Sequence, residues 1–130
     1  MFDAHGKYDF EIRGEIVFIR LYQSWNLECS KHFFAAYKQL ILEQKFEKYG
    51  VLADFSKLEG ATLDAIDYFQ DISRWALGQG QVARAQCIDS RLNQYIADIP
   101  TKDFKGFPIK NFENEDLALE WLRDQGLSIE

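Results

Sequence analysis

The sequence predicts an α/β fold: a single mixed, mostly parallel five-stranded sheet with an N-terminal hairpin and about four helices. Two observations lead to this prediction. The chain opens with two short apolar segments separated by a tight-turn signal, as in an antiparallel hairpin. Strand-like and helical hydrophobic periods then alternate, which favours parallel strands joined by right-handed crossovers. Because no linker or internal repeat divides the 130 residues, we expect one domain spanning residues 1–130.

The hairpin is predicted from two strands with different patterns. Residues 7–14 alternate between polar and apolar types, which indicates a half-buried strand. Its apolar side carries Tyr8, Phe10 and Ile12. Residues 16–22 are apolar on both faces, as expected for a central strand.

A long helix is expected after the hairpin. Asn26 is a suitable N-cap, and Glu28 places a negative charge in the first turn, where the helix dipole favours it. A core-facing stripe follows at helical spacing: Leu27, Phe34, Tyr37 and Ile41. Tyr49 and Gly50 end this helix, with Gly50 as its left-handed cap.

The middle of the chain predicts a strand, a helix and another strand. Residues 51–55 form the third strand, and Thr62 caps a second helix that runs to about Leu77. A glycine-rich turn stops this helix, and residues 82–88 form the fourth strand.

The last part of the chain completes the pattern. Residues 89–99 predict a short helix that ends at Pro100. Residues 107–112 predict an edge strand, because a proline within them cannot donate to a strand ladder. Asn114 caps the final helix, and Gly126 terminates it.

Charge and cysteine usage exclude several classes of protein. The formal net charge is -6, and no basic stripe of the kind that binds nucleic acid stands out. The two cysteines, Cys29 and Cys87, have no CxxC spacing, so we expect reduced and mostly buried thiols. Neither a signal peptide nor a membrane-length apolar run is evident. We therefore expect a cytoplasmic protein.

Two motifs carry a resemblance to a known family. Residues 53–58 read Ala-Asp-Phe-Ser-Lys-Leu and lead into a helix, and residues 112–122 read Phe-Glu-Asn-Glu-Asp-Leu-Ala-Leu-Glu-Trp-Leu. Together with the order of elements, these motifs resemble the SpoIIAA-like, STAS-related family, in particular its uncharacterised bacterial branch. The resemblance covers nearly the whole chain and implies the same sheet.

The resemblance also bears on whether phosphorylation switches the partners of this protein. In the sporulation-regulator branch, a serine at the start of the second helix is phosphorylated to change partners. Asp64 stands at that position here, so the hydroxyl is missing. A fixed carboxylate could mimic the modified state, or Asp64 could simply favour the helix dipole.

The joint between the third strand and the second helix, residues 51–69, is where ligands settle in α/β sheets. It contains no cysteine, histidine or phosphate-binding glycine loop. Its polar side chains are the candidate contacts to a ligand or anion: Asp54, Ser56, Thr62 and Asp64. This set favours recognition over catalysis.

No catalytic set is evident in the sequence. A serine nucleophile needs a base, yet His5 lies in the N-terminal tail and His32 lies in the middle of a helix. Asp54, Asp64 and Asp89 could line one crevice and bind magnesium, which keeps a metal-dependent enzyme as an alternative. The main expectation is a protein that is not an enzyme and needs no metal or cofactor.

The second helix has an unusually wide apolar arc. Ile66, Phe69, Ile72 and Ala76 form one stripe, and Tyr68 and Trp75 widen it to nearly half the helix. Either the helix is deeply buried, or the two flanking rings cover a ligand, a partner or a membrane. The predicted ligand or partner face comprises Trp25, Tyr68, Phe69, Ile72, Trp75, Phe104 and Phe107.

The loop at residues 101–107 is the most basic part of this acidic chain. Lys102 and Lys105 alternate with Phe104 and Phe107, a combination suited to an anionic ligand end or to lipid head groups. A solvated loop with one phenylalanine tucked beneath it explains the same pattern.

These observations favour a non-catalytic binding module for an apolar or amphiphilic small molecule, with transient membrane contact. The alternative is a protein–protein module or homodimer that uses the same surface or the sheet edge. Nucleic acid is not an expected partner in either case.

Overall fold

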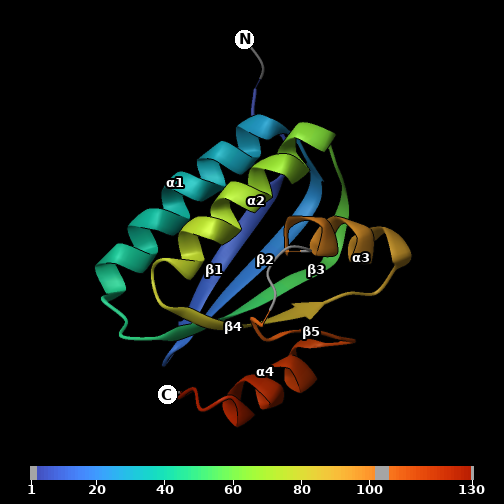
Figure 1. The fold of residues 1–130 in the computed structure, drawn as a ribbon. Coiled ribbons are helices and arrows are strands. Elements are labelled where there is room, and N and C mark those ends of the chain that lie inside the picture. Colours follow the sequence, from blue (N-terminus) through green and yellow to red (C-terminus); the bar gives the residue numbers. More distant parts are fainter. Residues whose placement is uncertain (1–2, 102–105, 130) are drawn as a thin grey trace.

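The computed structural model describes residues 3–101 and 106–129, which form one sheet in the order β1-β2-β3-β4-β5 (Figure 1). β1 (Lys7–Arg13) pairs antiparallel with β2 (Ile16–Trp25). The remaining neighbours are parallel: β3 (Tyr49–Ala61), β4 (Gln81–Cys87) and β5 (Ile109–Phe112). This mixed sheet confirms the predicted fold class and the order of strands and helices.

Helices cover the two faces of the sheet unequally. α1 (Leu27–Gln44) and α2 (Leu63–Leu77) lie side by side on one face, with α3 (Arg91–Asp98) beside them (Figure 1). On the opposite face α4 (Glu115–Asp124) packs on β3, β4 and β5. Two apolar cores result, and the core on the α4 face includes Ile16 and Phe18 of β2. Beyond them, the β1 edge of that face carries charged side chains instead.

The end of α1 differs from the prediction. Lys45, with φ of 53°, caps the helix, and Gly50 lies inside β3. Gly50 is needed for another reason, since a Cβ there would overlap the side chain of Leu127. The prediction was wrong because it attributed this glycine to a left-handed turn, whereas close packing against the C-terminal segment explains it.

β3 is also longer than predicted, and Ser56 lies within it. The extension pairs with the end of β2, where Ser24 faces Gly60 and Trp25 faces Ala61 after two register shifts. Residues 56–61 are too polar to resemble a buried strand, so their period could not reveal this pairing.

The helix starts follow the predicted caps, with one exception. Asn26 accepts a hydrogen bond from the Cys29 amide at 3.0 Å, and Asn114 accepts one from the Leu117 amide at 2.9 Å. Thr62 occupies the cap position of α2 without making a side-chain cap bond.

The later elements keep their predicted type with small boundary changes. After α3 the chain tightens into a 3₁₀ turn, η1 (Ile99–Thr101), that includes Pro100. Among the described residues, no helix has both the length and the apolar character needed to cross a bilayer.

Candidate functional site

The aromatic flank of α2 packs against α1. The Phe34 ring lies 5.8 Å from the ring centroids of both Tyr68 and Trp75 and meets each edge-on. Both residues are partly buried. Trp25 is 1% exposed and packs edge-on against Phe69 at 5.6 Å. Contact between the two helices therefore accounts for much of the wide apolar arc.

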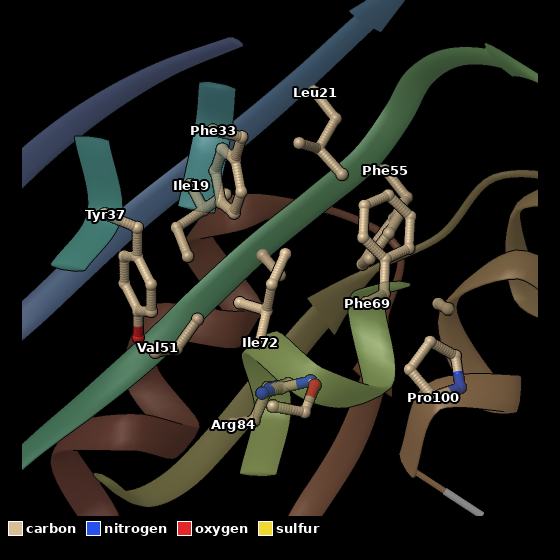
Figure 2. Close-up of a pocket in the computed structure, with 13 residues that line it drawn as sticks. Ile19, Leu21, Phe33, Tyr37, Val51, Phe55, Phe69, Ile72, Arg84 and Pro100 are labelled. Atoms are coloured by element: carbon tan, nitrogen blue, oxygen red, sulfur yellow. The ribbon is translucent and has the colours of Figure 1, made fainter. Parts of the chain in front are cut away.

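A cavity lies beneath α2, between this helix, the sheet and the α3–η1 segment (Figure 2). Its volume is about 60 Å³. Phe69 and Ile72 of the predicted face line it, whereas Trp25, Tyr68 and Trp75 do not. The other apolar lining residues are Ile19, Leu21, Phe33, Val51, Ala53, Phe55, Ala97 and Pro100.

Polar groups lie at one side of this cavity. The Arg84 Nη1 donates to Ser73 Oγ at 3.2 Å, and its Nε donates to Gln81 Oε1 at 3.2 Å. Burial lowers the pKa of Arg84, although a guanidinium stays charged in proteins. Within the described residues, no carboxylate lies within 4.0 Å of its nitrogens. The cavity thus combines apolar walls with one cation.

A pair of buried phenols lies next to the cation. The hydroxyls of Tyr37 and Tyr49 are 2.9 Å apart, and the Tyr49 hydroxyl also donates to the carbonyl of Ala76 at 3.4 Å. Burial raises the pKa of Tyr37 well above its ordinary value. Both phenols are therefore neutral at pH 7 and supply no counter-charge to Arg84.

The first turn of α2 lies on the surface. Thr62, Leu63 and Asp64 are all exposed, and 74% of Leu63 is accessible to solvent. The Thr62 hydroxyl donates to Asp64 Oδ1 at 2.5 Å, and the Ala65 amide donates to the same oxygen at 2.9 Å. Asp64 therefore stabilises the start of the helix locally.

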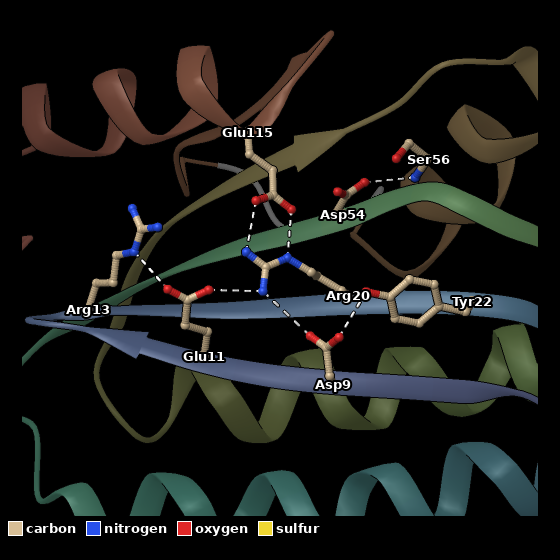
Figure 3. Close-up of polar contacts among 8 residues, drawn as sticks. All are labelled: Asp9, Glu11, Arg13, Arg20, Tyr22, Asp54, Ser56 and Glu115. Atoms are coloured by element: carbon tan, nitrogen blue, oxygen red, sulfur yellow. Dashed lines mark hydrogen bonds and ion pairs between the residues drawn. The ribbon is translucent and has the colours of Figure 1, made fainter.

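Asp54 lies away from this turn. Its side chain projects toward α4 and Glu115, on the opposite side of the sheet from α1 and α2 (Figure 3). The Ser56 amide donates to Asp54 Oδ1 at 2.9 Å. Asp89 is exposed. Across residues 3–101 and 106–129, no three His, Cys, Asp or Glu side chains come together as a metal site.

A charged network on the α4 face was missed by sequence reasoning (Figure 3). Arg20 donates to both carboxylate oxygens of Glu115, at 2.8 and 2.9 Å. The same guanidinium lies 3.0 Å from Glu11 and 3.5 Å from Asp9. The strand register places Asp9 opposite Arg20, so the polar alternation of β1 was the available signal. The network attaches the first turn of α4 to β1 and β2.

Two carboxyl groups near Arg20, Asp54 on β3 and Glu115 on α4, have pKa values shifted in opposite directions. The hydrogen bonds from Arg20 lower the pKa of Glu115. Burial, together with the neighbouring Glu115, raises the pKa of Asp54. Both shifts follow from the Arg20–Glu115 ion pair and the partly buried Asp54 beside it. They therefore need no catalytic role to explain them.

Both cysteines are free and buried. Burial raises the pKa of Cys29 to about 11 and that of Cys87 to about 12. Because the thiolate is the reactive form, neither is suited to nucleophilic chemistry at pH 7.

Part of the predicted lysine–phenylalanine loop lies outside the described residues, namely Lys102, Phe104 and Lys105. Phe107 is described and is partly buried.

With this geometry in place, comparison with solved structures identifies the fold. The chain has a SpoIIAA-like fold. It superposes on a protein of the DUF3478 family with a SpoIIAA-like fold from Shewanella loihica, with a TM-score of 0.68 and 15% identity over 94% of this chain and 97% of that one. This result confirms the resemblance at the level of fold.

Regulatory proteins share the same architecture. The anti-sigma factor antagonist SpoIIAA in its unphosphorylated form matches with a TM-score of 0.64 and 16% identity, over 90% of this chain and 98% of that one. An anti-sigma factor antagonist from Mycobacterium paratuberculosis matches with a TM-score of 0.65 and 12% identity, over 92% and 96%. No family model and no curated protein matches the sequence.

Proposed function

We propose that this protein is a non-catalytic protein-binding module that docks a partner on the first turn of α2. The observation that carries the proposal is Leu63, the most exposed large hydrophobic side chain in the described part of the chain, at 74%. Fully burying a leucine is worth roughly 1.5–3 kcal/mol. A partner that covers Leu63 would gain a large part of that free energy.

Other exposed apolar groups lie at the same edge of the sheet. α2 and α3 follow the carboxyl ends of the adjacent parallel strands β3 and β4, so both helices begin at that edge. α3 presents Leu92 and Tyr95, which are 52% and 58% exposed. Asn93 anchors α3 there by donating to the carbonyl of Leu58 at 3.1 Å. An interface of standard size, about 800 Å² per partner, would span both helix starts.

The charge of α2 indicates the chemistry of the partner. Asp64, Asp67 and Asp71 are exposed along the outer side of the helix. A surface with an apolar cleft for Leu63 and lysine or arginine residues around it would complement this pattern.

The structural relatives support a protein partner over other ligands. Two of them are anti-sigma factor antagonists, and SpoIIAA is also known in a phosphorylated form. In this chain Asp64 replaces the serine implied by the family resemblance, and its carboxylate is held by Thr62 and Ala65. We therefore expect partner binding that does not depend on phosphorylation at this position.

A carboxylate-based enzyme has less support. Asp54 points to the α4 face, whereas Asp64 opens a helix on the other face. The carboxylates of the alternative metal crevice are thus not assembled around one point.

The test replaces one exposed leucine and compares it with another. Immobilised wild-type protein is used to isolate partners from an extract of the source organism, and each purified partner is then titrated by calorimetry. Leu63→Asp should weaken binding by about 30-fold or more, as expected for a hot-spot residue. Leu42→Asp is the matched control, because Leu42 is 58% exposed on α1. Equal affinity of both variants would contradict the proposal.

A further inference from the structure

The cavity beneath α2 is separate from the surface around Leu63. Ile72 and Ser73, which line it, follow Leu63 by more than two helical turns and face the sheet. Both residues are buried, whereas Leu63 is exposed. A ligand in this cavity would therefore not cover the first turn of α2.

We infer that this cavity binds a small aliphatic carboxylate, with the carboxylate on Arg84 and Ser73 and the short apolar tail toward Val51, Phe55 and Ile72. Figure 2 shows Val51, Phe55, Ile72 and Arg84 around one space. Ser73 also lines it and accepts a hydrogen bond from Arg84 at 3.2 Å. Apolar walls with a few convergent polar groups are the usual composition of a small-molecule site.

The charge of Arg84 is the first argument for an anion. Its side chain projects from β4 into the layer between the sheet and α2, where its described partners, Ser73 and Gln81, are both neutral. Arg84 is partly buried, so solvent offsets only part of the cost of keeping this cation without a counter-charge. A bound carboxylate would offset the rest.

The hydrogen-bonding capacity of Arg84 is the second argument. Nε and Nη1 each donate to one neutral acceptor, and Nη2 has no acceptor among the described residues. A planar guanidinium matches the two oxygens of a carboxylate through its paired N–H groups. The Ser73 hydroxyl, 3.2 Å from Nη1, supplies a further donor at the same place.

The size and lining of the cavity limit the ligand. Its volume of about 60 Å³ is well below the roughly 150 Å³ of an engineered cavity that admits benzene. Most of the remaining lining is aliphatic or aromatic, which does not suit phosphate or sulfate. Short unbranched carboxylates such as propionate and butyrate would place only a tail of two or three carbons in this volume, with the carboxylate beside the partly exposed Arg84.

The experiment is a titration of ¹⁵N-labelled protein with propionate, butyrate, octanoate, butyramide and inorganic phosphate, followed by amide chemical shifts. We expect butyrate to shift the amides of Ile72, Ser73 and Arg84 with a dissociation constant of about 1 mM or below. Butyramide, which has the same shape without the charge, and phosphate should bind at least about 10-fold more weakly. Octanoate should not fit.

Variants connect the binding to Arg84. Arg84→Met should weaken butyrate binding at least about 10-fold, whereas Arg74→Met on the exposed side of α2 should leave it unchanged. Arg84→Lys keeps the charge without the paired donors and should weaken binding several-fold. Ile72→Phe should fill the cavity and abolish butyrate binding.

Several results would overturn the inference. These are butyramide or phosphate binding as tightly as butyrate, unchanged affinity in Arg84→Met, or no localised shifts with any carboxylate. If Arg84→Met does not fold, Arg84→Lys and Ile72→Phe decide the question. None of these failures affects the partner affinity of Leu63→Asp, which tests the other surface.

Discussion

At the scale of single residues, Arg20 illustrates how one cation organises a polar sheet face. Its guanidinium holds Glu115 through two hydrogen bonds and contacts Glu11 through an ion pair. It also lies 5.0 Å from the ring of Phe18, which it helps to shield from solvent. Arg20 therefore serves both packing and charge pairing.

Glu115→Gln should lower the free energy of unfolding by about 1–2 kcal/mol at pH 7, because Arg20 loses a charged bidentate partner. The pKa of Glu115 is lower in the folded protein than its usual value of 4.5. Its contribution is therefore present above that usual value and is lost as the pH falls through the folded pKa. Urea unfolding at several pH values measures the difference.

Glu120→Gln, an exposed change in the same helix, is the control and should be close to neutral. A Glu115→Gln effect of the same size at pH 3 and pH 7 would show that the charge of Glu115 does not contribute.

Asp54→Asn should instead raise the free energy of unfolding. The pKa of Asp54 is raised above 3.8 in the folded protein, so its ionisation costs stability as the pH rises above 3.8. The amide removes that cost, and its oxygen still accepts from the Ser56 amide. We expect a gain of about 0.5 kcal/mol at pH 7 and none at pH 3, since the carboxyl remains partly solvated. Thermal unfolding of Asp54→Asn and of the exposed control Asp67→Asn checks this; a loss at pH 7 would contradict it.

At the scale of elements, the helix starts are not equivalent. The Asn26 side chain accepts from the amides of Cys29 and His5 and donates to the carbonyl of Asp3. It thus ties the N-terminal segment to α1. Thr62 makes no such cap bond, and its hydroxyl is used by Asp64. The start of α2 is therefore less firmly fixed by its cap than the start of α1.

Asn26→Ala should cost about 1–2 kcal/mol of unfolding free energy, whereas Thr62→Ala should cost a few tenths. The difference follows from the bonds that each side chain makes to backbone groups. Chemical denaturation of both variants measures it. Equal losses would mean that Thr62 caps α2 in solution.

At the scale of the whole molecule, hydrophobic period and capping residues predicted the sheet and the order of its elements. These signals are local, so they succeeded where each element carries its own pattern. They failed for Gly50, whose role depends on Leu127, 77 residues later in the chain. They also failed for residues 56–61, which become a strand only by pairing with the bulged end of β2.

The candidate site was predicted less fully for the same reason. The apolar arc of α2 was visible in the sequence, and Phe69 and Ile72 do line a cavity. One part of this arc, Tyr68 and Trp75, packs against Phe34 of α1, and the other part lines the cavity. This division depends on where α1 lies, which the sequence of α2 does not show. Arg84 looked like an ordinary strand residue, since nothing nearby in the sequence shows that it faces α2.

The most direct test of the proposed docking surface is photo-cross-linking within cells of the source organism. A photoreactive p-benzoylphenylalanine replaces Leu63 in one variant and the exposed control Leu42 of α1 in another. We predict a defined covalent adduct with a protein partner from position 63 and none from position 42. Adducts formed equally from both positions, or only from position 42, would contradict the assignment of the first turn of α2 as the partner surface.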